Sequence, residues 1–213
     1  GYFYPDIGTS FNPGRMNTQL VEAFIERGGT YLKEEVKDFE LVSDRCLNII
    51  TDSGKHPCEN IVLTAGAWSK EMAQKLGCDV YLTAERGYHI MVNQLKSPLK
   101  TPIVSADYHI AITPMEAEIR MSTMSEFSSI SAPEIHQTAY GIMKQASHVV
   151  RNIDLQPNSR WVGPRPATPD SLPIIGRSGK YKNVIFVISV FLLFAIVIGL
   201  TISLTDYNVR DSI

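Results

Sequence analysis

Residues 61–69 read Ile-Val-Leu-Thr-Ala-Gly-Ala-Trp-Ser, and this stretch decides the fold. The continuous apolar run 61–65 is typical of a strand that is buried on both faces. Gly66 and the small residue after it predict a tight turn, and Ser69 is placed to cap a short helix that ends before Gly77. The stretch therefore predicts a strand, a turn and a helix, as in the later half of a nucleotide-binding domain.

A helix and several strands are expected before this unit. Asn12 followed by Pro13 is a helix-start signal, and apolar residues four apart then form one helical stripe that Gly28 ends. A turn is expected at residues 52–55. Strands are expected at 30–36, 39–42 and 46–51.

The second half of the chain predicts an antiparallel sheet with a covering helix. A capping box, residues 131–134, precedes a helical pattern that reaches Val149. Residues 160–176 contain four prolines and little periodicity, so a structured loop is expected there. Further strands are expected at 88–92, 108–113 and 119–124. The fold class is therefore mixed α and β (α+β), with strands outnumbering helices.

Composition excludes several classes of protein. The chain has 213 residues, of which 44% are hydrophobic and 20% charged, and this usage excludes a disordered or fibrous protein. The formal net charge is −2 and there is no basic block, so no nucleic-acid partner is expected. The widely spaced Cys46, Cys58 and Cys78 argue against a disulfide framework and for a reducing compartment. His56 and Cys58 lack a second ligand pair, so no metal site is expected.

Two segments could carry chemistry. The turn at Gly66 allows close approach of a ligand to the backbone, although tight packing alone would explain it. Arg165 lies between two prolines, which hold its guanidinium ready for a carboxylate, although a solvated arginine in a rigid loop is the alternative. His89 and His109 on expected strands are more typical of packing residues. The motifs of P-loop enzymes, serine hydrolases and zinc proteases are absent from the sequence.

Four stretches in this order carry a family resemblance: IVLTAGAWS, RGYHIMV, STMSEF and RPATPDSLPIIG. Together they resemble the FAD-dependent D-amino-acid dehydrogenase and oxidase family, especially the bacterial small-subunit dehydrogenase type. The resemblance extends from the YFYPDIGTSFNPGRM opening to Val187. It implies part of a Rossmann-like FAD-binding domain plus a substrate-binding sheet. The family's opening strand and glycine fingerprint are missing here, so we expect a C-terminal half that is inactive by itself.

The resemblance also implies roles for individual residues. Arg165 matches the arginine that holds the substrate carboxylate. Tyr88 and Tyr108 would lie on the sheet that covers the flavin and take part in catalysis. Val36, at the end of its expected strand, would contact the adenine side of FAD through its backbone. The expected FAD-binding residues are Val36, Ala65, Gly66, Ala67, Trp68 and Gly176.

The implied reaction is the oxidative deamination of an amino acid. A hydride passes from the substrate to the flavin, and the resulting imine hydrolyses to a 2-oxo acid and ammonia. The electron acceptor would be a quinone or oxygen. The expected location is the cytoplasm, with association at the inner face of the plasma membrane as a further expectation.

The apolar run 184–204 departs from the family pattern. Where the family has a Gly-His-Gly-His-like stretch, residues 194–198 read Phe-Ala-Ile-Val-Ile. Three explanations stay open: a membrane span, a divergent buried strand and helix, or a slip of the reading frame. In the third explanation, codons for Gly-His-Ser-His are read one base later and then encode residues 195–198. The first explanation supports an alternative function, a non-catalytic binding module tethered to a membrane by residues 184–204.

Three segments follow from this interpretation. Residues 1–84 would form a partial FAD domain that ends beyond the AGAWS turn, and residues 85–160 the substrate-binding sheet with its helix. Residues 161–213 would form a C-terminal segment that contacts the flavin.

Overall fold

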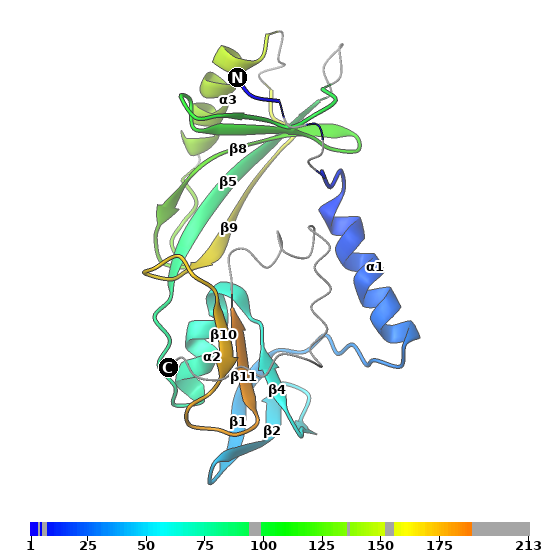
Figure 1. The fold of residues 1–213 in the computed structure, drawn as a ribbon, viewed down its shortest axis with the longest axis vertical. Helices are drawn as coiled ribbons and strands as arrows, with labels where there is room; N and C mark the ends of the chain where they lie inside the picture. The colour runs from blue at the N-terminus through cyan, green and yellow to red at the C-terminus, as the bar shows by residue number, and fades with distance from the viewer. Residues whose placement is uncertain (4, 6–7, 94–98, 136, 152–155, 189–213) are drawn as a thin grey trace.

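The computed structural model describes residues 1–3, 5, 8–93, 99–135, 137–151 and 156–188. Within them the chain forms a lower and an upper part, drawn one above the other in Figure 1. The elements are α1 (Pro13–Glu26), β1 (Val36–Val42), β2 (Arg45–Thr51), β3 (Lys55–Pro57), β4 (Ile61–Leu63), the 3-10 helix η1 (Gly66–Trp68), α2 (Ser69–Lys75), β5 (Thr83–Asn93), β6 (Ile103–Ser105), β7 (Ile110–Pro114), β8 (Glu118–Phe127), α3 (Gln137–Val149), β9 (Ser159–Ala167), β10 (Ile174–Arg177) and β11 (Val184–Ile188).

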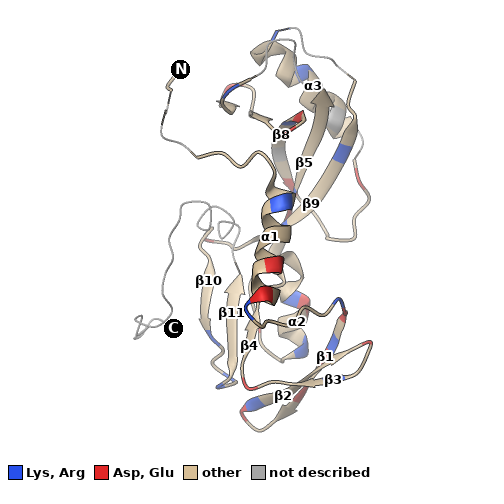
Figure 2. Ribbon diagram, turned by 90° about the vertical axis from the view of Figure 1, so that its right-hand side faces the viewer, with Lys and Arg blue, Asp and Glu red and all other residues tan. Residues whose placement is uncertain are grey.

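Helix α1 begins as its sequence predicts. The side chain of Asn12 accepts a hydrogen bond from the Arg15 amide at 2.9 Å, and Pro13 occupies the first helical position. Asn12 and Arg15 also bond to Glu116, between β7 and β8, which ties the start of the helix to the upper sheet. The apolar stripe is not buried, since Leu20 and Phe24 are each about half exposed. Figure 2 shows α1 in front of the two parts, extending from the upper sheet toward the lower part.

The lower part combines two small sheets with α2. Strand β11 lies between β10, which is antiparallel to it, and β4, which is parallel to it. Strands β1, β2 and β3 form an antiparallel meander. The expectation that β4 is buried on both faces is wrong, because Val62 is 55% exposed. The buried core of this part comprises Phe39, Cys46, Ile61, Leu63, Ala73, Leu76, Leu82, Tyr181, Val184, Phe186 and Ile188.

One buried amide joins the meander to the other sheet. Asn183, which precedes β11, accepts a hydrogen bond from the Cys46 amide at 2.9 Å. Its own amide group donates to the carbonyl oxygens of Cys46 and Glu59, at 2.7 and 3.0 Å. Because Asn183 is 1% exposed, water cannot replace these bonds. This side chain therefore holds the two sheets in register.

We expect Asn183→Ala to lower the free energy of unfolding by about 2–4 kcal/mol, because it leaves buried backbone groups of Cys46 without partners. Urea unfolding followed by circular dichroism would measure the change. The matched control is Asn158→Ala, whose side chain makes two hydrogen bonds but is exposed. Equal losses in the two variants would contradict the prediction.

The upper part is a five-stranded antiparallel sheet in the order β6-β7-β8-β5-β9, and α3 covers one face. Side chains alternate along β5: even-numbered residues such as Tyr88 and Ile90 pack under α3. The odd-numbered residues therefore point to the opposite face, which α3 does not cover. We call this second surface the open face. Register places on it Glu85, Gly87, His89, Met91, Arg120, Ser122, Ser125, Trp161, Gly163 and Arg165.

Three local predictions are corrected. Residues 30–35 form no strand, since β1 starts only at Val36 after the charged Lys-Glu-Glu sequence. The capping box does not start α3, because the carbonyl groups of Ala132 and Pro133 accept hydrogen bonds from Arg86 and the helix begins at Gln137. Residues 160–176 are not simply a loop: they contain most of β9 and the first part of β10. Prolines fit β9 because it is an edge strand.

Both internal boundaries of the predicted segments fall within strands. The boundary at 160/161 falls within β9, so residues 161–167 belong to the upper sheet. Strand β5 crosses the boundary at 84/85 in the same way, since it begins at Thr83.

The apolar run 184–204 is described only in part. Its first five residues form β11, with Val184, Phe186 and Ile188 buried. In the part of the chain that the structure describes, no helix is long and apolar enough to cross a membrane. The remainder of the run, including the proposed frame slip at 195–198, lies outside the described residues.

Candidate active site

Arg165 lies on the open face at the edge of the upper sheet. Strand β9 places it opposite Glu85, and its guanidinium extends across the neighbouring Gly87. A Cβ atom at position 87 would lie 2.3 Å from an Nη atom of Arg165. The glycine therefore provides the space that this guanidinium occupies. Among the described residues, no side chain forms an ion pair or hydrogen bond with the guanidinium.

A second arginine and a histidine lie on the same face. Arg120 pairs with Met91 of β5, two residues beyond His89. Burial lowers the pKa of Arg120, and the charge of Arg165 lowers it further. Burial also lowers the pKa of His89, and here the additional contribution comes from the charge of Arg120. The open face is thus a partly desolvated surface with concentrated positive charge.

An aromatic side chain covers part of this surface. The ring of Trp161 stacks on His89, with ring centres 4.9 Å apart. It also lies directly against Gly163, where a Cβ atom would clash with the indole. This arrangement leaves an apolar wall beside the two arginines.

The lowered pKa of His89 predicts a pH dependence of stability. An unfolded histidine takes up its proton near pH 6.5, whereas the folded protein resists protonation of His89. The contribution of neutral His89 to the free energy of unfolding should therefore be fully present above about pH 6.5. It should be lost as the pH falls below this value and through the lower pKa of the folded state. Urea unfolding at pH 7.5 and 5.5 would measure this, and His89→Gln should flatten the difference. An unchanged pH dependence in that variant would contradict the assignment.

The AGAWS turn meets the strand that carries Arg165. It forms η1, directly after β4, and η1 packs against β9. Gly66 has φ +55°, with open space where a side chain would be, and Trp68 is 49% exposed, whereas Ala67 is buried. Ser69 does not cap α2: it lies in the first turn, and its buried Oγ has no hydrogen-bond partner among the described residues.

The other predicted cofactor residues lie in the lower part. Val36 is at the start of β1, not at the end of a strand, and it packs with Ala65 against the lower core. Gly176 lies in β10, which β11 separates from β4. A Cβ atom at Gly176 would contact nothing within 4 Å.

Neither tyrosine ring lies on the open face with Arg165. Tyr88 points under α3, on the face opposite Arg165, where its hydroxyl bonds to Glu126 at 2.6 Å. Tyr108 lies in the turn before β7, and its ring stacks on His148 of α3 at 5.0 Å. Residue parity along β5 explains this placement of Tyr88, because the odd-numbered His89 is the one that shares a face with Arg165.

Arg120 and Trp161 were not predicted as site residues. Arg120 lies in an expected strand, but its face could be assigned only from the pairing register, whereas Trp161 lies in a segment that was expected to be a loop. A bulge between Gly87 and His89 shifts the pairing of β5 with β8, so counting residues would not have placed Arg120.

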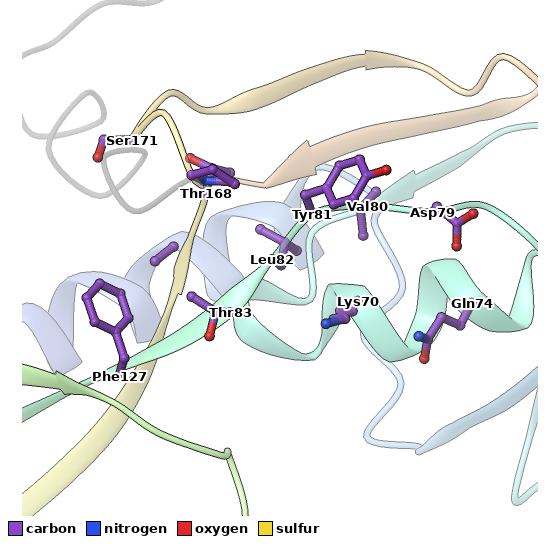
Figure 3. Close-up of a pocket in the computed structure, with 12 residues that line it drawn as sticks. Lys70, Gln74, Asp79, Val80, Tyr81, Leu82, Thr83, Phe127, Thr168 and Ser171 are labelled. Atoms are coloured by element: carbon purple, nitrogen blue, oxygen red, sulfur yellow. The ribbon is translucent and has the colours of Figure 1, made fainter.

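A separate cavity of about 600 Å³ lies where the two parts join. Figure 3 shows Lys70 and Gln74 of α2 below it, with Tyr81, Thr83 and Phe127 nearby. Arg165 does not line this cavity, but Thr83, Phe127 and Ala167 do, and the register places them on the same face of the sheet, so the cavity borders one end of the open face.

Comparison with known proteins identifies the class to which this fold and site belong. Residues 1–198 match the family model described as DAO, FAD dependent oxidoreductase. The chain therefore belongs to this family of FAD-dependent oxidoreductases, and the predicted fold class and family resemblance are confirmed.

The names of individual relatives describe enzymes that act on amino acids. The D-amino acid dehydrogenase of Helicobacter pylori is 29% identical over 178 residues, covering 82% of this chain and 43% of the relative. The D-amino-acid oxidase of Bradyrhizobium diazoefficiens is 22% identical over 190 residues, covering 87% and 45%. The chain thus spans less than half the length of these relatives.

Solved structures agree on the fold. L-proline dehydrogenase from P. horikoshii superposes with a TM-score of 0.76 at 16% identity, covering 88% of this chain and 53% of that protein. Glycine oxidase from Geobacillus kaustophilus gives 0.73 at 19% identity, covering 85% and 50%.

The residues present fit the FAD on which this family depends. Gly66 offers a backbone with a positive φ and open space at its Cα, which lets a flat or polar group approach closely. The exposed Trp68 and the unpartnered Ser69 hydroxyl belong to the same turn. Ala65, Gly66 and Trp68 are therefore the residues that would contact the cofactor in this part of the chain.

Proposed function

We propose that this chain is the substrate-binding part of an FAD-dependent enzyme that oxidises an amino acid to a 2-oxo acid and ammonia. The observation that carries the proposal is the guanidinium of Arg165. Arg165 is exposed on the open face and has no ionic partner among the described residues, and its strand packs against the glycine turn η1. The names of the relatives support amino acids as the substrate class.

The chain contributes binding and orientation to this reaction. Arg165 has the planar fork that matches a carboxylate, and its proline-flanked backbone lowers the entropy lost when the substrate binds. The apolar ring of Trp161 excludes water from one side of the bound substrate. Bound FAD supplies the hydride acceptor. The protein therefore acts mainly by holding the reacting carbon in a fixed orientation.

Gly87→Ala should weaken carboxylate binding more than it weakens the fold. The three atoms nearest to the added methyl group would all belong to the guanidinium end of Arg165, which must therefore move away from its position. We expect KM to rise several-fold while the free energy of unfolding changes by about 1 kcal/mol or less. Steady-state kinetics and urea unfolding measure the two effects. Gly141→Ala, in open space on α3, is the control and should leave KM unchanged.

Compartment and electron acceptor form part of the proposal. Cys46, Cys58 and Cys78 are free thiols, which supports a cytoplasmic location, including the inner face of the plasma membrane. The acceptor is a quinone or oxygen, and the test below separates them.

Anaerobic addition of amino acids to the FAD-loaded whole enzyme tests the reaction. D-Alanine or glycine should bleach the flavin absorbance and yield one ammonia and one 2-oxo acid per turnover. Readmission of oxygen, or of a soluble quinone in its absence, then shows which acceptor restores the colour. If no amino acid of either configuration bleaches the flavin, the proposed function is wrong, and the membrane-tethered binding module becomes the explanation to test.

A further inference from the structure

The open face carries more positive charge than one carboxylate requires. Arg165 and Arg120 both point to this face, from the two strands that flank β5. The guanidinium of Arg165 lies over Gly87, while Arg120 is in register with Met91. Four residues of strand correspond to about 13 Å. The guanidinium of Arg165 already lies at one end of this distance, so the side chain of Arg120 and the ligand span the rest.

No carboxylate neutralises either arginine within the described residues. Glu85 is the acidic side chain opposite Arg165 in the register, but it accepts a hydrogen bond from Ser125 and forms no ion pair with Arg165. Arg86, on the other face of the same strand, shows the contrast, since it pairs with Glu126 at 2.7 Å. The sheet thus neutralises its buried arginine beneath α3 and leaves the two arginines of the open face unpaired.

Two like charges on a partly desolvated surface destabilise each other. Here the effect is visible in the pKa of Arg120, which burial and the charge of Arg165 both lower. The neighbouring His89 resists protonation for a related reason, so it adds no third charge at neutral pH. A ligand with two separated negative charges would relieve the repulsion between both arginines.

We propose that Arg120 binds a second, side-chain carboxylate, so that the substrate class of this site is the amino dicarboxylic acids. The proposal rests on the proposed function, in which Arg165 binds the first carboxylate. His89 lies on β5 between Gly87 and Met91, and the Trp161 ring stacks on it. These two rings would contact the carbon chain that links the two carboxylates.

Unreactive acids test this specificity without any turnover. Succinate carries two carboxylates, and propionate carries one on a chain of similar size. Isothermal titration of the FAD-loaded enzyme should show succinate binding at least 10-fold more tightly than propionate. Arg120→Gln should reduce this preference to less than 3-fold and leave the Kd for propionate unchanged. Arg120→Lys should retain part of the preference, because it keeps the charge.

The same strand pair offers a matched control. Arg160 lies on β9 but faces α3, where its guanidinium covers the ring of Tyr140 at 5.3 Å. Arg160→Gln removes the same charge from the other face and should preserve the preference for succinate. The melting temperature of each variant without ligand establishes that it is folded, and Arg120→Gln should melt no lower than the parent.

The results separate this proposal from the proposed function. Equal affinity for the two acids, or a succinate preference that survives Arg120→Gln, overturns the dicarboxylate site and leaves the role of Arg165 intact. If Arg165→Gln changes the binding of neither acid, both proposals are wrong. A kinetic comparison then completes the test: kcat/KM for D-aspartate over D-alanine should fall at least 10-fold in Arg120→Gln.

Discussion

Arg165→Lys in the whole enzyme is expected to lower kcat/KM for the amino acid by about 30- to 1,000-fold. This corresponds to about 2–4 kcal/mol of lost binding, the range for a charge-assisted, partly desolvated contact. Lysine keeps the charge but cannot form two parallel hydrogen bonds to one carboxylate. The loss should appear mainly as a higher KM, because the contact forms with the substrate before hydride transfer.

Two controls show whether the loss of kcat/KM is specific to Arg165. Arg160→Lys makes the same chemical change on the face beneath α3, and it should leave kcat/KM within about 2-fold of the parent. The flavin spectrum of Arg165→Lys should match that of the parent, since Arg165 lies outside the η1 turn. An unchanged kcat/KM in Arg165→Lys would remove this residue from the site.

The largest loss of stability is expected from Arg86→Ala. Arg86 is 3% exposed and donates hydrogen bonds to the hydroxyl of Tyr88 and to the carbonyl groups of Ala132 and Pro133. It also pairs with Glu126. Its removal leaves a carboxylate without its partner and releases the segment that leads into α3. We expect the melting temperature to fall by about 10 °C.

Calorimetry with a graded set of variants would test this network. Tyr88→Phe removes one hydroxyl and retains the ion pair, so its melting temperature should fall much less. The double variant Arg86→Met with Glu126→Gln removes both charges and should recover part of the loss, because no unpaired charge remains. A fall of less than about 2 °C in Arg86→Ala would show that the network contributes little.

The sequence predicted best where neighbouring residues determine the structure. Asn12 and Pro13 start α1 through local geometry, and the turn at Gly66 follows directly from its small residues. Family resemblance identified Arg165, and the fold then brought its strand against that turn. These features depend on contacts within a few positions or on a recognisable motif.

The prediction failed where distant strands decide the outcome. Tyr88 and His89 are adjacent on a strand and so point to opposite faces, but only the packing of α3 and the pairing with β9 decide which of them shares a face with Arg165. The strand assignment of residues 160–167 was missed because four prolines in the segment suggested a loop, whereas an edge strand tolerates them. A bulge in the pairing of β5 with β8 places Arg120 opposite Met91 on the open face, and no local sequence pattern reveals this bulge.

The stacking of Trp161 on His89 gives the enzyme an internal optical probe. An indole responds to the charges around it, so its emission should change when an anion arrives beside the two arginines. Trp68, the other tryptophan of the chain, lies in the turn that would meet the flavin. Replacing one indole at a time by phenylalanine would therefore let substrate capture and cofactor loading be timed separately in a stopped-flow fluorimeter, without any attached dye.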